Sequence, residues 1–251
     1  MKWVRYEHEG KASYGFIMGD IVMEIDGLPY ANVRQTGKTV PLQEVKLLAP
    51  CEPSKIVCVG LNYTDHVKEM ERWELPKEPA IFLKPPTTVI GPDDAIIYPA
   101  LTQNLHYEGE LAVVIKTECK DVKKDKAKEY IFGCTCANDV TARDLQHADL
   151  QWTRGKSFDT FCPLGPCIET DFNLEKAKIK TLLNDKTVQD SNIDQLVFDV
   201  PVIIEYISAV MTLKPGDVIL TGTTSGVGPM QKGDRVMVEI EGIGALANIV
   251  K

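Results

Sequence analysis

The chain has 251 residues, of which 44% are hydrophobic and 25% are charged, so it can bury a sizeable core in one catalytic domain with a small appendage. Its net charge of −8 and its isoelectric point near 5.1 disfavour a nucleic acid or an anionic membrane surface as partner. The N-terminal residues lack the apolar core of a signal peptide, no apolar run approaches the roughly 18 residues of a membrane span, and seven cysteines without paired spacing fit free thiols, so we expect a cytoplasmic protein.

The first 48 residues predict a small β-rich domain. Short runs of aromatic and β-branched residues at 2–6, 14–18 and 21–25 are separated by turn residues. The proline-containing stretch Ala49–Pro53 is typical of a connector, because each proline removes a backbone donor and blocks helix continuation. We therefore expect a small N-terminal β domain over residues 1–48 and a catalytic domain over residues 49–251.

A buried strand is predicted at Lys55–Gly60, and a candidate acid–base pair follows it. If residues 61–70 form a short helix, His66 and Glu69 are neighbours on one face, and a carboxylate beside an imidazole prepares the ring to act as a general base. The same spacing is common in surface pairs without a catalytic role, and spacing alone favours that alternative. The polar stretch 71–79 predicts a loop of the kind that can serve as an active-site lid.

The next predicted strand begins at Ala80 and runs into a turn that contains two prolines. Lys84 lies at the end of this strand. From the sequence it could face an anionic ligand as a substrate-binding residue, or extend its ammonium group to solvent.

The stretch His106–Ile115 ends as an apolar strand and begins with two acids, Glu108 and Glu110, which share one face because side chains alternate along a strand. A second strand-like run, residues 130–137, stops just before Asp139, which would lie beside the pair if the two strands are neighbours. Three carboxylates offer the hard oxygen ligands that suit Mg²⁺, Mn²⁺ or Ca²⁺ better than zinc or copper. The alternative is a solvated polar strand edge, which is the usual role of a Glu-x-Glu pair.

Two polar segments follow these acids. A surface helix is predicted at Asp121–Tyr130, and a short helix after Thr141 carries Arg143 and Gln146 back toward the acids. Residues 152–159 predict a loop around Lys156. A lysine in such a loop is normally solvated, but near three carboxylates and a metal it becomes a candidate anchor for a substrate carboxylate or oxyanion.

The last third of the chain predicts mostly strands. Two of them flank Asn184-Asp185 as a hairpin, and an amphipathic helix with proline in its first turn is expected at Val200–Ile207. The glycine-rich stretch 222–228 has no lysine after its last glycine and no clear helix behind it, which excludes a phosphate-binding P-loop. We expect a pocket-lining turn that offers backbone N–H groups or hydroxyls, with Thr223 as a substrate-binding residue.

Six ordered motifs resemble the fumarylacetoacetate hydrolase family over Lys55 to Lys251. They are Val59-Gly-Leu-Asn-Tyr-Thr-Asp-His66, Phe82-Leu-Lys-Pro85, Tyr107-Glu-Gly-Glu-Leu111, Asn138-Asp-Val-Thr-Ala-Arg-Asp144, Arg154-Gly-Lys-Ser-Phe-Asp159, and Pro215-Gly-Asp-Val-Ile219 leading into Gly222-Thr223. One departure is visible, since many members have Gly-Thr-Pro where this chain has Thr224 after Thr223. That change bears on the shape of the substrate pocket.

The resemblance implies an α+β, predominantly β fold, a mixed β-sheet roll that is usually a homodimer. It also implies a divalent metal held by Glu108, Glu110 and Asp139, a lid segment that carries His66 and Glu69, and Lys156 as the substrate-anchoring lysine.

The expected function is metal-dependent hydrolysis of a C–C bond in an acylpyruvate-like 2,4-dioxo acid. The cation would stabilise an enolate, Lys156 with Arg143 would offset surplus negative charge, and the His66–Glu69 pair would activate water. The alternatives are an oxaloacetate-type 2-oxo acid decarboxylase and a 2-hydroxyhepta-2,4-diene-1,7-dioate isomerase. A rival from another class is a non-catalytic β protein whose acids hold Ca²⁺ for stability.

Overall fold

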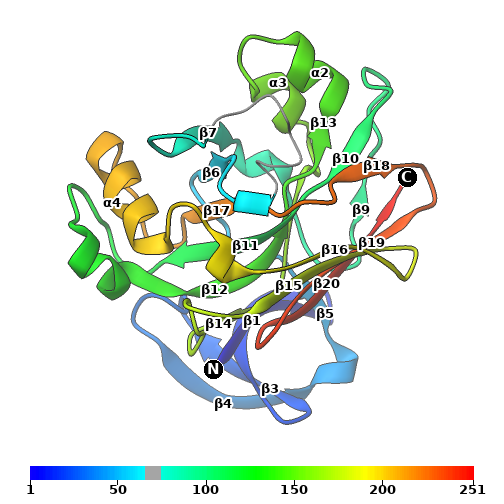
Figure 1. The fold of residues 1–251 in the computed structure, drawn as a ribbon. Coiled ribbons are helices and arrows are strands. Elements are labelled where there is room, and N and C mark those ends of the chain that lie inside the picture. The colour runs from blue at the N-terminus through cyan, green and yellow to red at the C-terminus, as the bar shows by residue number, and fades with distance from the viewer. Residues whose placement is uncertain (66–74) are drawn as a thin grey trace.

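The computed structural model describes residues 1–65 and 75–251, which form three β-sheets with few helices (Figure 1). The expected α+β, predominantly β fold is confirmed. In the described part of the chain, no helix is long and apolar enough to cross a membrane.

The largest sheet has twelve strands and runs through the middle of the molecule. Ten of them follow one another in the order β4 (Arg34–Pro41), β3 (Ile21–Asp26), β2 (Lys11–Met18), β1 (Lys2–His8), β14 (Cys162–Glu169), β12 (Ile131–Asn138), β11 (Gly109–Ile115), β17 (Val218–Thr223), β6 (Ile56–Gly60) and β7 (Ala80–Lys84). The other two lie off this path, where β5 (Lys46–Leu48) pairs with β1 and β8 (Val89–Ile90) pairs with β14. The sheet is mixed, because β17 and β6 are parallel while β11 is antiparallel to both of its neighbours.

Two smaller sheets complete the β structure. One contains β13 (Thr141–Ala142), β10 (Leu105–Tyr107) and β18 (Gly228–Met230). The other contains β16 (Lys186–Asn192), β15 (Lys178–Leu183), β19 (Arg235–Ile240), β20 (Gly244–Val250) and β9 (Ala95–Ile96). The predicted hairpin is present, since β15 pairs with β16 across Asn184 and Asp185, which both have the positive φ that two-residue hairpin turns favour.

Three α-helices and four short 3₁₀ helices lie wholly within the described residues. The α-helices are α2 (Arg143–Ala148), α3 (Thr153–Lys156) and α4 (Val200–Val210). The 3₁₀ helices are Leu42–Glu44, Pro86–Thr88, Lys124–Tyr130 and Ile193–Gln195. The expected helix with an early proline is α4, whose first turn is capped by the Asp199 carboxylate accepting from the Val202 N–H.

Two local expectations differ from the structure. The segment predicted as a surface helix from Asp121 is a 3₁₀ helix that begins only at Lys124, because Asp121 itself has a positive φ and cannot start a right-handed helix. The predicted loop 152–159 contains the one-turn helix α3, which the sequence did not indicate since Gly155 weakens any helical pattern there.

Strand β11 is buried along its whole length and lies between two layers of the core. Leu111, Val113 and Ile115 pack into one hydrophobic cluster, whereas Ala112 and Val114 pack into another. Because strand side chains alternate, a continuous apolar run is what a strand covered on both faces requires. This core fixes the position of the acidic residues at its start.

The N-terminal strands extend the central sheet. β1 pairs with β14, and the Trp3 ring packs against Phe16 and Phe132 at centroid distances of 5.5 and 5.9 Å. In Figure 1, β1 lies beside β14, and the blue strands β3 and β4 lie at the bottom of the view. The division of the chain at residue 48 stays a prediction.

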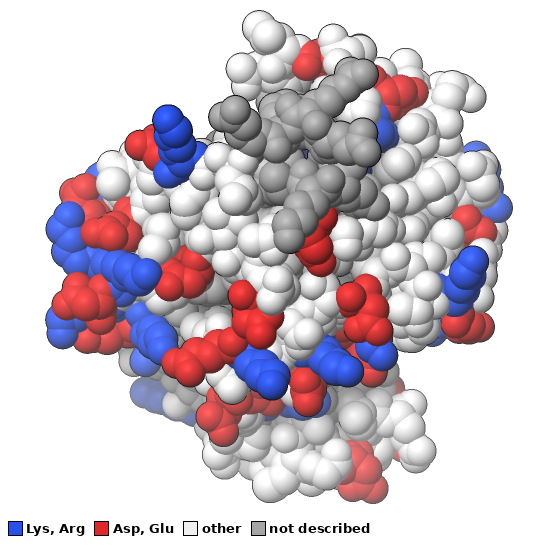
Figure 2. Space-filling view, in the orientation of Figure 1, with Lys and Arg blue, Asp and Glu red and all other residues white. Residues whose placement is uncertain are grey.

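Charged side chains of both signs intermingle on the face of the molecule shown in Figure 2. The described residues drawn there form no continuous basic surface.

Candidate active site

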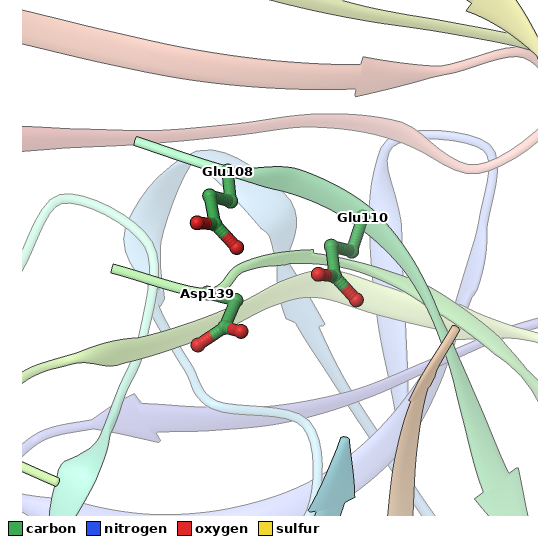
Figure 3. A group of neighbouring side chains, drawn as sticks. All are labelled: Glu108, Glu110 and Asp139. Carbon is green, nitrogen blue, oxygen red and sulfur yellow. The ribbon is translucent and has the colours of Figure 1, made fainter. Parts of the chain in front are cut away.

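Three carboxylates meet where β11 begins and β12 ends (Figure 3). Glu108 immediately precedes β11, Glu110 is its second residue, and Asp139 immediately follows β12. The two strands are neighbours with Gly109 opposite Asn138, and one oxygen from each acid lies within 4.8 Å of those of the other two. The three acids are only 5%, 2% and 1% exposed, so the solvated strand edge that the sequence also allowed is wrong.

The backbone around these acids is held by specific hydrogen bonds. The Glu108 N–H donates to the Asn138 side-chain oxygen at 2.9 Å, and the Asp139 N–H donates to the Glu108 carbonyl at 2.8 Å. Gly109 lies between the two glutamates, and a Cβ atom there would come within 2.1 Å of the Thr181 hydroxyl oxygen. Only glycine fits this position, so the spacing of the pair depends on close backbone packing.

Three cationic side chains surround two of the acids. The Lys156 ammonium contacts Glu108 at 2.8 Å and Asp139 at 2.6 Å, Lys84 pairs with Asp139, and Arg143 pairs with Glu108. Lys156 is buried, as is Lys84, whose ammonium also donates to the Val140 carbonyl at 3.1 Å. The alternative that Lys84 extends to solvent is therefore wrong.

Glu110 differs from the other two acids. Among the described residues it makes no ion pair with a lysine or arginine, and one of its oxygens accepts the Gly222 N–H at 2.7 Å. Burial, together with the neighbouring Asp139 and Glu108, raises the pKa of the Glu110 carboxyl well above its usual range. A buried carboxylate that faces two others fits a hard divalent cation such as Mg²⁺ or Mn²⁺.

The charges of the site balance in the state in which all three acids are ionised. Burial alone lowers the pKa of Lys156, but the Asp139 and Glu108 carboxylates raise it above its ordinary value, so the ammonium group keeps its proton. Three ionised acids and three cationic groups sum to zero, so a divalent cation bound to the ionised acids would give the site two positive charges. A site with that surplus favours an anionic ligand.

Arg143 is oriented by two further side chains. It donates to the Gln146 side-chain oxygen at 2.5 Å and its Nε lies 3.5 Å from His106 Nδ1. Burial and the nearby Arg143 charge lower the pKa of His106 to about 4, so the imidazole is neutral at physiological pH and can accept from the guanidinium. No pattern in the sequence singles out His106 for this role.

A pocket opens over the acids. Its lining includes the following predicted site residues: Glu108, Glu110, Asp139, Arg143, Gln146, Lys156 and Thr223. Lys84 is not part of the described lining and contacts Asp139 instead. The predicted His66–Glu69 pair lies outside the described residues.

The pocket is also lined by residues that were not predicted from the sequence as site residues, among them His147, Phe82 and Trp152. His147 follows Arg143 by four positions in α2, a spacing that places both on one helix face and could have drawn attention to it. The rings of Phe82 and Trp152 meet edge to face with centroids 5.4 Å apart, and no local signal connects these two residues. They give the pocket an aromatic wall beside its charged floor.

Two family models match the chain. The model for the fumarylacetoacetate (FAA) hydrolase C-terminal domain matches residues 55–251, and one described as Rv2993c-like, N-terminal, matches residues 1–50. The chain is also similar to the human protein named oxaloacetate tautomerase FAHD2A, mitochondrial, at 43% identity over 224 residues, which covers 84% of this chain and 71% of the relative.

Solved structures agree with these matches. The crystal structure of 5-carboxymethyl-2-hydroxymuconate delta-isomerase from Mycobacterium smegmatis superposes with a TM-score of 0.94 at 46% identity, over 100% of this chain and 99% of that one. Maleylpyruvate hydrolase from Sphingobium sp. SYK-6, solved in complex with manganese(II) and pyruvate, superposes with a TM-score of 0.82 at 31% identity, over 100% and 98% of the two chains.

Proposed function

The chain belongs to the fumarylacetoacetate hydrolase family, and on that premise we propose that it is a divalent-metal-dependent enzyme acting on a small anionic 2-oxo acid by way of its enolate. The observation that carries the proposal is the buried cluster of Glu108, Glu110 and Asp139 beside the Lys156 ammonium. Mg²⁺ or Mn²⁺ held by these three acids would supply electrophilic stabilisation of the negative charge that develops on an enolate oxygen.

The protein's own side chains would bind and orient the substrate. Lys156 is a protonated, buried donor at the floor of the pocket, where it can hold a carboxylate or keto oxygen. Arg143, fixed by Gln146 and His106, adds a second positive charge at the same end. The Phe82 and Trp152 rings would exclude water from the apolar part of the ligand.

We place proton transfer first among the reactions that can follow. An oxaloacetate tautomerase at 43% identity and a hydroxymuconate isomerase at 46% identity both carry names that require a proton to move and no bond to be hydrolysed. The charge balance agrees with a 2-oxo diacid, since two negative charges would neutralise the site once a divalent cation is present.

Hydrolysis of an acylpyruvate-like C–C bond is the second candidate. The structure of maleylpyruvate hydrolase in complex with manganese(II) and pyruvate favours it. The water-activating His66–Glu69 pair expected from the sequence lies outside the described residues. The support for hydrolysis therefore comes from the similarity to maleylpyruvate hydrolase and from the sequence motifs.

One preparation of the protein with Mn²⁺ distinguishes these reactions. We expect faster loss of enol absorbance from oxaloacetate without release of CO₂, and loss of this acceleration on chelation. Release of acetate and pyruvate from acetylpyruvate would favour the hydrolase, and CO₂ release from oxaloacetate would favour the decarboxylase. Tight Mn²⁺ binding with none of these turnovers would favour the non-catalytic metal-binding alternative.

A further inference from the structure

Gln189, in strand β16, is hydrogen-bonded to both β11 and β17, the strands that carry Glu110 and Thr223. It is 2% exposed, and its side chain uses both of its ends. The side-chain oxygen accepts the Gly109 N–H at 3.0 Å, and the side-chain nitrogen donates to the Thr223 hydroxyl at 2.9 Å and the Thr224 carbonyl at 2.9 Å. The Thr224 hydroxyl lies 3.2 Å from the same nitrogen.

Hydrogen bonds link Gln189, Thr223 and Gly109 into a closed ring, and Gly109 is the residue between Glu108 and Glu110. The Thr223 hydroxyl donates to the Gly109 carbonyl at 3.0 Å, so both backbone polar groups of Gly109 are bound by Gln189 and Thr223. β10 ends at Tyr107 and β11 begins at Gly109, so the backbone changes from one sheet to another between them. The Gln189 side-chain amide therefore holds the backbone at Gly109, the residue between Glu108 and Glu110.

The same contacts explain what Thr224 does in this chain. Both its carbonyl and its hydroxyl lie within hydrogen-bond distance of the Gln189 amide nitrogen, whereas a proline at this position would keep the carbonyl and lose the hydroxyl. The Gly-Thr-Thr sequence thus adds a contact to Gln189 on the side of the pocket that Thr223 lines.

We propose that Gln189 is a positioning residue, which sets the spacing of the Glu108 and Glu110 carboxylates and the place of Thr223, and through them the affinity of the site for a divalent cation. The inference rests on the proposed function, because it assumes that these acids bind metal. Metal sites demand ligand positions within a few tenths of an ångström, and groups that orient the ligands typically account for about 10–100-fold in affinity or activity.

The test compares Gln189→Met with Asn248→Leu. The methionine keeps the approximate volume and removes all the hydrogen bonds of Gln189. Asn248 is a matched control, because it is a buried amide that donates at 2.9 Å to the carbonyls of both Gly91 and Asp94, neither of which lines the pocket. We expect both variants to lose thermal stability, but only Gln189→Met to bind Mn²⁺ about tenfold more weakly, measured as free Mn²⁺ by electron paramagnetic resonance.

A second pair of variants tests the Thr223 hydroxyl, which belongs to the same ring of hydrogen bonds. Thr223→Ser keeps the hydroxyl that bridges Gln189 and Gly109, and Thr223→Val removes it. We expect near-normal Mn²⁺ affinity in the serine variant and weakened affinity in the valine variant, a distinction that decides the matter if Gln189→Met does not fold. In a foldable double variant, the losses from Gln189→Met and Thr223→Val should be less than additive, because both break one ring.

Three results would contradict the inference. Unchanged Mn²⁺ affinity in Gln189→Met, alongside a stability loss like that of Asn248→Leu, would overturn the positioning role and leave the proposed function standing. Equal Mn²⁺ affinities in Thr223→Ser and Thr223→Val would do the same. Absence of Mn²⁺ binding in the wild-type protein would overturn both the inference and the proposed function.

Discussion

At the scale of single residues, Glu110 differs from Glu108 and Asp139 in how its buried charge is compensated. Glu108 contacts Lys156 and Arg143, and Asp139 contacts Lys156 and Lys84. Glu110 faces the other two acids, and within residues 1–65 and 75–251 its hydrogen bond comes from the Gly222 N–H, to one oxygen. Burying a carboxylate without an opposite charge is unfavourable unless it is neutralised. A divalent cation or a proton must therefore accompany Glu110 in the folded protein.

Substitution of Glu110 by Gln separates stability from metal binding. The amide keeps an acceptor for the Gly222 N–H and is neutral without binding a proton or a cation, so the metal-free variant should melt at or above the temperature of the metal-free wild type. A gain of about 1 kcal/mol would raise the melting temperature by roughly 2–4 °C in a chain of this size. The rise in melting temperature that Mn²⁺ produces in the wild type should disappear, as differential scanning calorimetry would show. A variant that still responds to Mn²⁺ would show that Glu110 is not a ligand.

At the scale of elements, the close approach of the strand ends at the site depends on a glycine backbone. Gly222, near the end of β17, has a φ of +103° and donates its N–H to Glu110 at the start of β11. A Cβ atom on Gly222 would lie 2.9 Å from the Asn62 Cβ, in the segment that follows β6. Three elements thus approach closely at one glycine.

Gly222→Ala should cost more than backbone strain alone. Gly233 is a matched control because its φ is +93° but no atom lies within 4 Å of a Cβ placed there. We expect Gly233→Ala to lose about 1–2 kcal/mol of unfolding free energy from the left-handed backbone and to leave Mn²⁺ affinity unchanged. Gly222→Ala should lose more and also bind Mn²⁺ more weakly, as urea unfolding and Mn²⁺ titration would measure. Equal effects of the two substitutions would mean that the close approach has no consequence for the site.

Local patterns in the sequence predicted several helices and strands. They did not predict the contacts between residues far apart in the sequence. Apolar periodicity and turn residues predicted β11, the β15–β16 hairpin and α4, because each depends on residues a few positions apart. The family motifs predicted which acids converge. The burial of Lys84 against Asp139 and the contacts of Gln189 with Gly109 depend on how strands 55 and 80 residues apart are packed, which no local pattern specifies.

At the scale of the whole molecule, the central sheet joins the N-terminal strands to the strands that carry the site. Because β1 continues the ladder through β14 and Trp3 packs on Phe132, the first 48 residues share hydrogen bonds and core with the strands that hold the site. The homodimer that the family resemblance implies stays a prediction, as does the domain boundary.

This continuity predicts that the monomer unit unfolds in a single cooperative transition. Far-ultraviolet circular dichroism, which follows the whole sheet, and hydrogen exchange at the amides of β2 and β3 should give the same midpoint in denaturant. Loss of the N-terminal strands at a lower denaturant concentration, with the rest of the sheet intact, would show instead that residues 1–48 form an independent unit.

The most direct measurement is anomalous diffraction from crystals soaked with Mn²⁺ and oxalate, a stable mimic of a 2-oxo acid. We predict one anomalous peak bounded by oxygens of Glu108, Glu110 and Asp139, with the oxalate beside it and within reach of Lys156. An anomalous map without a peak at these carboxylates, or with the manganese bound elsewhere, would contradict the account.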